Sequence, residues 1–216
     1  MACGSGQGCG ILSAVAKSFE AGDYSERILG IARRHYGERV RLQQFDAQRL
    51  PFADGSKDVI LLFEALYYIP DARQFVSECR RVLRSGGAVL IVTANKDLSD
   101  FNPSPHSHRY YGAPELRALF EEQGFASELF GFLEVGSVSL RQKLLRPVKA
   151  AAVRLGLVPK TMAGKDLLRR IVFGKLTPMP AELPVSSAPL AEPKALRADA
   201  PDRLHKVLYC HATLRT

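Results

Sequence analysis

Two aspartates and a run of glycines have the chemistry to bind a nucleotide-like ligand. The chain opens on MACGSGQGCG. Such glycines let the backbone approach a ligand closely, and the helix that follows favours a nucleotide-like or carboxylate group at its N-terminus. Asp23, in AGDYS, is placed to accept hydrogen bonds from two ribose hydroxyls, and Asp46, in QQFDAQRLPF, can accept one from an exocyclic amine. The segment FEALYYIPD, straight after an apolar run, is a fourth candidate.

These segments must be positioned by strands, because ligands of open α/β sheets bind at the carboxyl ends of the strands. Apolar alternation or continuous apolar runs predict strands at 18–23, 39–45, 57–63, 88–95, 126–135 and 205–214. Helical spacing, caps and closing glycines predict helices at 8–18, 26–36, 71–83 and 113–124. The alternation over residues 1–136 predicts an α/β fold with a mainly parallel sheet. The runs KDVILLF and AVLIVTAN predict strands buried on both faces.

The set of motifs resembles the class I S-adenosylmethionine-dependent methyltransferases, in particular the small-molecule methyltransferase type 11 group. The resemblance covers about residues 1–136 and the last strand. It implies a Rossmann-like sheet with an antiparallel last strand, and S-adenosyl-L-methionine as cofactor. The family's first motif is acidic-x-Gly-x-Gly-x-Gly; Gly4 and Gly6 fall on glycine positions, and Ala2 departs from the pattern at the first.

The resemblance also implies which residues bind the cofactor. The glycine loop contacts it, the aspartate of AGDY takes the ribose, the Asp-Ala pair of FDAQ reads the adenine edge, and the Phe-Glu pair of LFEA lines the methionine part. The implied cofactor-binding residues are Ala2, Gly4, Ser5, Gly6, Asp23, Tyr24, Asp46, Ala47, Phe63 and Glu64.

A strand is missing ahead of the glycine turn, since Met1 stands only a residue or two before it. In the family this first strand sits in the middle of the sheet, and an acidic residue of the first motif ends it. Its loss would expose the edges of two neighbours and unpair buried backbone groups at about 1–3 kcal/mol each. Proteins have only about 5–15 kcal/mol of stability. We therefore expect this chain to be an N-terminally truncated form.

Two other classes of function stay open. A nicotinamide-binding dehydrogenase would need Gly-x-Gly-x-x-Gly, but counting from Gly4 the third position is Cys9, and the Asp46 loop would have no role. A degenerate binding module without turnover is the other class, because the acidic residue of the first motif is absent. Asp23 and Asp46 could also be simple turn or cap residues.

The catalytic residues are harder to assign, because methyl transfer is largely a matter of positioning the nucleophile. His106 and His108, in the loop at 96–112, could orient a substrate or remove a proton near neutral pH, and Tyr68 is a further candidate. The alternative, which we favour for the loop, is a surface loop whose tyrosines pack on the following helix. Tyr68 could equally be a core aromatic. The acceptor is expected to be a small molecule, or linked to a lipid or glycan.

Positive charge is concentrated in one segment. Residues 140–175 hold ten basic residues and one acid, so this segment alone exceeds the net charge of +8 of the whole chain. Its amphipathic spacing favours either a lid that docks on an anionic membrane surface or anionic substrate, or a helical insert with a solvated basic face. Nucleic acid is a less favoured partner, because no aromatic residues interleave the charges.

Composition and length limit the remaining possibilities. A chain of 216 residues that is 46% hydrophobic and 24% charged forms an ordinary globular core. We expect a methyltransferase core at 1–136, a basic insert and Pro-rich linker at 137–204, and a last core strand at 205–216. The absence of a signal peptide or a long apolar run predicts a cytoplasmic protein, with peripheral membrane contact as an option. Four cysteines without metal spacing predict reduced thiols and no bound metal.

Overall fold

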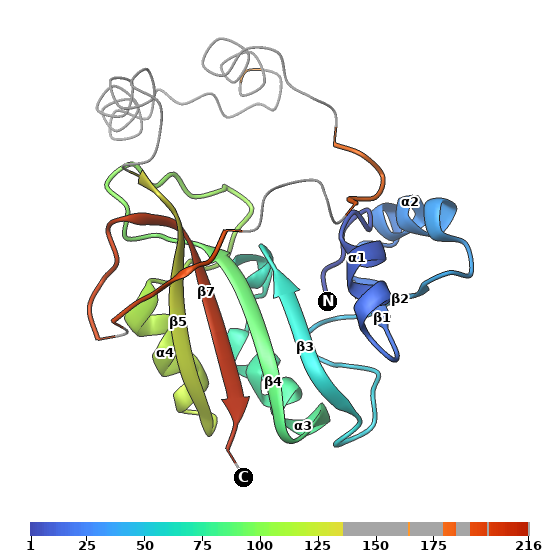
Figure 1. The fold of residues 1–216 in the computed structure, drawn as a ribbon, viewed down its shortest axis with the longest axis horizontal. Coiled ribbons are helices and arrows are strands. Elements are labelled where there is room, and N and C mark those ends of the chain that lie inside the picture. The colour runs from blue at the N-terminus through green and yellow to red at the C-terminus, as the bar shows by residue number, and fades with distance from the viewer. Residues whose placement is uncertain (136–163, 165–178, 185–190, 198, 216) are drawn as a thin grey trace.

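The computed structural model describes residues 1–135, 164, 179–184, 191–197 and 199–215 (Figure 1). Helices and strands alternate through the first 135 residues, as the sequence predicts. The elements, in chain order, are α1 (Cys9–Val15), β1 (Glu20–Asp23), α2 (Glu26–Tyr36), β2 (Arg41–Gln44), β3 (Lys57–Phe63), the 3-10 helix η1 (Leu66–Tyr68), α3 (Ala72–Val82), β4 (Leu83–Ala94), α4 (Ala113–Glu121), β5 (Phe125–Glu134), β6 (Lys194–Ala195) and β7 (His205–Leu214). The α/β fold class is confirmed.

The main sheet has five strands in the order β3-β4-β7-β5-β6. β3 and β4 pair in parallel, and β7 runs antiparallel between β4 and β5, so β3, β4 and β5 share one direction. Figure 1 shows α3 and α4 on the same face of this sheet, where they cover the largest hydrophobic core. The antiparallel last strand is therefore confirmed.

In the part of the chain that the structure describes, β1 and β2 form a second sheet that is separate from the first. The first three residues bridge the two sheets: the Met1 amino group donates to the Leu61 carbonyl of β3 at 2.7 Å, and the Cys3 N–H donates to the Gly22 carbonyl of β1 at 3.0 Å. Within the described part of the chain no strand lies between β1 and β3. This is the place in the sheet where the resemblance implies the family's first strand.

The prediction that 57–63 forms a strand buried on both faces is wrong. Ile60 and Leu62 are buried against the helical layer, but Val59 and Phe63 are 57% and 56% exposed. Leu90 of β4 is also exposed by about a third. The reason is that the described residues place no helix over the opposite face of β3. A continuous apolar run reports hydrophobicity, but it does not report which faces other elements cover.

The C-terminal strand is fastened to the core by Asn95, which follows β4 and is 1% exposed. Its Nδ2 donates to the Asp202 carbonyl at 2.7 Å and to the His205 carbonyl at 2.9 Å.

Within the predicted linker, Lys194 and Ala195 pair with β5 as the short strand β6. The predicted basic segment lies outside the described residues except for Gly164. In the part of the chain that the structure describes, no helix is both long and apolar enough to cross a membrane.

Candidate functional site

The predicted ligand-binding segments meet at one edge of the two sheets. β1 and β2 run parallel with Asp23 opposite Gln44, and β3 and β4 run parallel with Phe63 opposite Val92. Residues 1–3 connect the two pairs close to the carboxyl ends of β1 and β3. The glycine loop that follows therefore leaves the sheets just beyond these strand ends, where ligands of this fold class bind.

The glycine loop needs backbone conformations that favour glycine. Gly4 and Gly6 have φ values of +57° and +90°. Ala2 has φ +51°, in the left-handed region that side chains with a Cβ disfavour, which explains why its position prefers glycine. A Cβ on Gly6 would lie 2.8 Å from Cε2 of Tyr36 and 3.0 Å from Cβ of Ala32. Gly6 is thus fixed both by its conformation and by the helix α2 packed beneath it.

Asp23 ties the end of β1 to this loop. Its Oδ2 accepts from the Gly4 N–H at 2.9 Å, and its Oδ1 accepts from the Ser25 N–H at 2.9 Å. An ionised carboxylate has about four lone-pair sites, so Asp23 keeps capacity for further donors. The neighbouring Tyr24 is 75% exposed, and its backbone carbonyl accepts from the Gln44 side chain.

Asp46 and Ala47 follow β2, on the same edge. Asp46 Oδ1 accepts from the Gln48 N–H at 2.8 Å, which is the local turn that aspartate commonly makes. The Phe45 N–H donates to the Asp23 carbonyl at 3.3 Å, which fixes this loop beside β1. Ala47 packs against the main core. The structure therefore brings Asp46 close in the fold to Asp23, while its carboxylate also serves its own turn.

Glu64 stands at the end of β3 in a strained conformation. Its φ is +51°, and its N–H donates to the Val92 carbonyl at 2.7 Å. The Tyr67 hydroxyl donates to Glu64 Oε2 at 3.0 Å. Burial raises the pKa of the Glu64 carboxyl above its usual value, although the Tyr67 hydrogen bond acts in the opposite direction. Phe63, by contrast, is more than half exposed beside it.

The histidines of the loop at 96–112 take no part in this cluster through their side chains. His106 and His108 are exposed; the His108 N–H donates to the Tyr67 carbonyl at 2.8 Å. Tyr111 of the same loop is buried in the main core. This arrangement corresponds to the surface-loop interpretation, although Tyr110 packs on η1. Tyr68 is 48% exposed.

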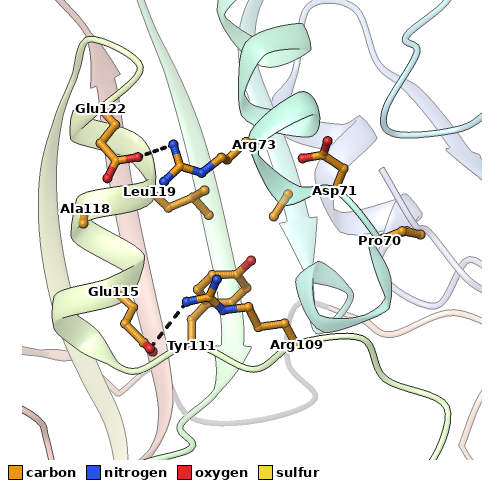
Figure 2. A pocket seen from close by; sticks show the side chains of 10 residues that line it. Pro70, Asp71, Arg73, Arg109, Tyr111, Glu115, Ala118, Leu119 and Glu122 are labelled. Atoms are coloured by element: carbon orange, nitrogen blue, oxygen red, sulfur yellow. Dashed lines mark ion pairs between the residues drawn. The ribbon is translucent and has the colours of Figure 1, made fainter.

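A cavity of about 250 Å³ lies between α3 and α4 (Figure 2). Its two arginines are paired with glutamates, Arg73 with Glu122 at 2.6 Å and Arg109 with Glu115 at 3.6 Å. None of the ten residues implied to bind the cofactor lines it. The cavity and the candidate cofactor site therefore share no residue.

Sequence reasoning missed Tyr36, which supports the glycine loop from below. This side chain is 2% exposed; its hydroxyl donates to the Gly6 carbonyl at 2.7 Å and accepts from the Gly10 N–H at 3.0 Å. No local signal could reveal this role, because the contacts cross about 30 positions of sequence. The Glu64–Tyr67 hydrogen bond was also missed, although its spacing of three residues is a detectable signal.

The chain is similar in sequence to known methyltransferases over part of its length. The family model described as a methyltransferase domain (Methyltransf_11) matches residues 1–91. A probable S-adenosylmethionine-dependent methyltransferase from Mycolicibacterium smegmatis is 36% identical over 132 residues, which are 58% of this chain and 50% of that protein. A ubiquinone biosynthesis O-methyltransferase from Sinorhizobium medicae is 32% identical over 99 residues, 44% of this chain and 40% of that protein.

The fold is also shared with solved structures. The YcgJ protein from Bacillus subtilis has a TM-score of 0.60 at 19% identity, covering 100% of this chain and 90% of that one. The chain spans about half the length of the curated relatives it matches. The chain is thus similar to the methyltransferase-domain family over residues 1–91 and to S-adenosylmethionine-dependent methyltransferases over part of its length, and it shares the fold of the solved structure.

Proposed function

We propose that this protein transfers the methyl group of S-adenosylmethionine to a hydroxyl oxygen of a quinone-type aromatic acceptor. The observation that carries the proposal is the convergence of the glycine loop, Asp23 and Glu64 at one edge of the sheets. The acceptor class is supported by the similarity to the Sinorhizobium medicae ubiquinone biosynthesis O-methyltransferase.

The residues at this edge fit such a cofactor. A Cβ built on Gly4 or Gly8 would meet no atom within 4 Å, so the outer side of the loop is open to a ligand. Asp23 has lone pairs left for ribose hydroxyls after its two backbone hydrogen bonds. The exposed ring of Tyr24 stands next to it, where it can cover a flat base.

The chain contributes mainly by positioning. When bound, S-adenosylmethionine supplies an electrophilic methyl group on a sulfonium. Asp23 would hold the ribose, and the loop backbone from Gly4 to Gly6 would lie along the methionine part. The end of β3, with Phe63 and Glu64, would border the reacting end. Holding a nucleophile in line in this way can supply several kcal/mol, up to about 7–11, of the barrier reduction.

Calorimetric titration with S-adenosylhomocysteine tests the proposal. We expect the full chain to bind it, and Asp23→Asn to bind about 10- to 150-fold more weakly, since a hydrogen bond to a charged group contributes about 1.5–3 kcal/mol. Asp58→Asn, at an exposed carboxylate on β3, is the matched control and should bind normally. A folded chain that binds no S-adenosylhomocysteine would favour the degenerate module, and preferential binding of NADH would favour the dehydrogenase.

A further inference from the structure

We propose that Glu64, Tyr67 and Tyr110 form the acceptor side of the site: the tyrosine rings hold a planar hydroxylated aromatic, and Glu64 takes the proton from its hydroxyl. This inference rests on the proposed function and deepens it, because it names the group that recognises the acceptor. It also gives Glu64 a role different from the cofactor contact that the family resemblance implies.

The backbone at Glu64 is the first observation. A non-glycine residue with φ +51° stores strain, and such residues cluster at functional sites. The conformation is fixed by the hydrogen bond from the Glu64 N–H to the Val92 carbonyl of β4. Met1 donates to the Leu61 carbonyl, so the start of the chain runs beside the end of β3, the strand that Glu64 follows.

The Tyr67–Tyr110 pair is the second observation. The two rings are stacked, with centroids 4.5 Å apart and planes 23° from parallel. Phe101 and Tyr68 contact this pair edge-on, at 4.7 Å from Tyr110 and 4.5 Å from Tyr67 respectively. The Tyr67 carbonyl accepts from the His108 N–H, so the 3-10 helix η1 and the loop at 96–112 hold the stack together. Flat aromatic faces of this kind favour flat aromatic ligands.

The charge environment of Glu64 suits proton transfer. The titratable groups that face it are Tyr67, from η1, and Tyr209, from β7, and both are phenols that stay neutral near pH 7. Among the residues that the structure describes, no cation is found to act on Glu64, and burial raises the pKa of its carboxyl. A carboxylate whose pKa is raised towards the working pH is a better general base.

The chemical step balances without any further reactant. The O–H proton of the acceptor moves to a Glu64 carboxylate oxygen, and an oxygen lone pair forms the new O–CH₃ bond. The S–CH₃ bond breaks as its electron pair returns to sulfur, which leaves S-adenosylhomocysteine and a methyl ether. Glu64 then releases the proton to water.

Acceptor binding is tested with catechol, and with trans-1,2-cyclohexanediol as the non-aromatic control, by saturation-transfer NMR on the full chain with saturating S-adenosylhomocysteine. We expect saturable binding of catechol only. Tyr67→Leu and Tyr110→Leu should each weaken it roughly 2- to 10-fold, the range of aromatic pair energies. Tyr67→Phe, which keeps the ring, and Phe52→Leu, at an aromatic pair outside the stack, should not. Equal binding of both probes, or no binding of catechol, would overturn the inference.

The role of Glu64 is tested by kinetics of catechol methylation. Glu64→Gln should lower kcat/KM about 10²- to 10⁴-fold, abolish the rise of kcat/KM with pH, and leave S-adenosylhomocysteine affinity unchanged. Glu128→Gln, an exposed carboxylate on β5, should match the wild type. Lost S-adenosylhomocysteine affinity in Glu64→Gln would assign Glu64 to the cofactor, and absent turnover of bound catechol would remove its proton-transfer role. Failure of the wild type to bind S-adenosylhomocysteine would instead overturn the proposed function itself.

Discussion

The hydroxyl of Tyr36 gives a sharp prediction about the glycine loop. Tyr36→Phe removes the hydrogen bonds to the Gly6 carbonyl and from the Gly10 N–H, and it keeps the buried ring. Gly6 retains a second donor, the Cys9 N–H at 2.9 Å, so its carbonyl stays paired. Gly10, in the first turn of α1, loses its acceptor. An unpaired donor of this kind costs about 1–3 kcal/mol.

Two measurements read this cost. The free energy of unfolding from urea titration should fall by about 1–3 kcal/mol, and S-adenosylhomocysteine affinity should fall by up to about 150-fold, because every 1.4 kcal/mol is a factor of ten. If the free energy of unfolding falls little while the affinity falls strongly, the lost hydrogen bond mainly served to order the glycine loop for the ligand. Tyr111→Phe, which removes a hydroxyl from another buried tyrosine, is the control and should bind normally. A Tyr36→Phe chain with wild-type stability and affinity would refute the reasoning.

Three further predictions concern single groups. Gly6→Ala should lower the melting temperature more than Gly4→Ala, because both have positive φ but only the Gly6 Cβ would meet the Tyr36 ring; equal losses in thermal melts would contradict this. Burial lowers the pKa of the Met1 amino group below its ordinary value of about 8, so between these two pKa values the unfolded chain binds more protons than the folded chain. The free energy of unfolding should therefore rise with pH across that window and level off above about pH 8. N-terminal acetylation should flatten that pH dependence in denaturant titrations. Asn95→Ala should cost about 1–3 kcal/mol of unfolding free energy, since two buried carbonyls lose a donor; a loss near zero would contradict the assignment.

Local structure was predictable from local signals. The helix predicted at 26–36 is observed at those bounds, since Ser25 precedes it in an extended conformation and Gly37, with φ +54°, ends it. Asp71 caps α3 as expected, by accepting from the Gln74 N–H at 3.0 Å. Such signals lie within a few residues of the element they define, and they need no knowledge of tertiary contacts.

Tertiary relations were predictable only where order along the chain determines them. The strand ends that carry Asp23, Asp46 and Glu64 could be named because parallel strands expose their carboxyl ends at one edge. The exposed face of β3, with Val59, could not be foreseen, because it depends on which element covers it. The support of the loop by Tyr36 likewise depends on packing between segments distant in sequence.

The two sheets carry different halves of the candidate site. β1 carries Asp23 and β3 carries Glu64, and the hydrogen bonds of Met1 and Cys3 join these strands across the gap. A cofactor that contacts both halves would therefore add non-covalent contacts between the two sheets, which the hydrogen bonds of Met1 and Cys3 otherwise join. Binding stabilises the native state by about 2.7 kcal/mol at a hundred times Kd. We expect S-adenosylhomocysteine to slow hydrogen exchange most in β1 and β2, while β4 and β7, which pair with each other from Ala88 to Ala94 of β4, change least. Uniform slowing across both sheets would show that the small sheet does not open on its own, and the gap would then have no consequence for ligand binding.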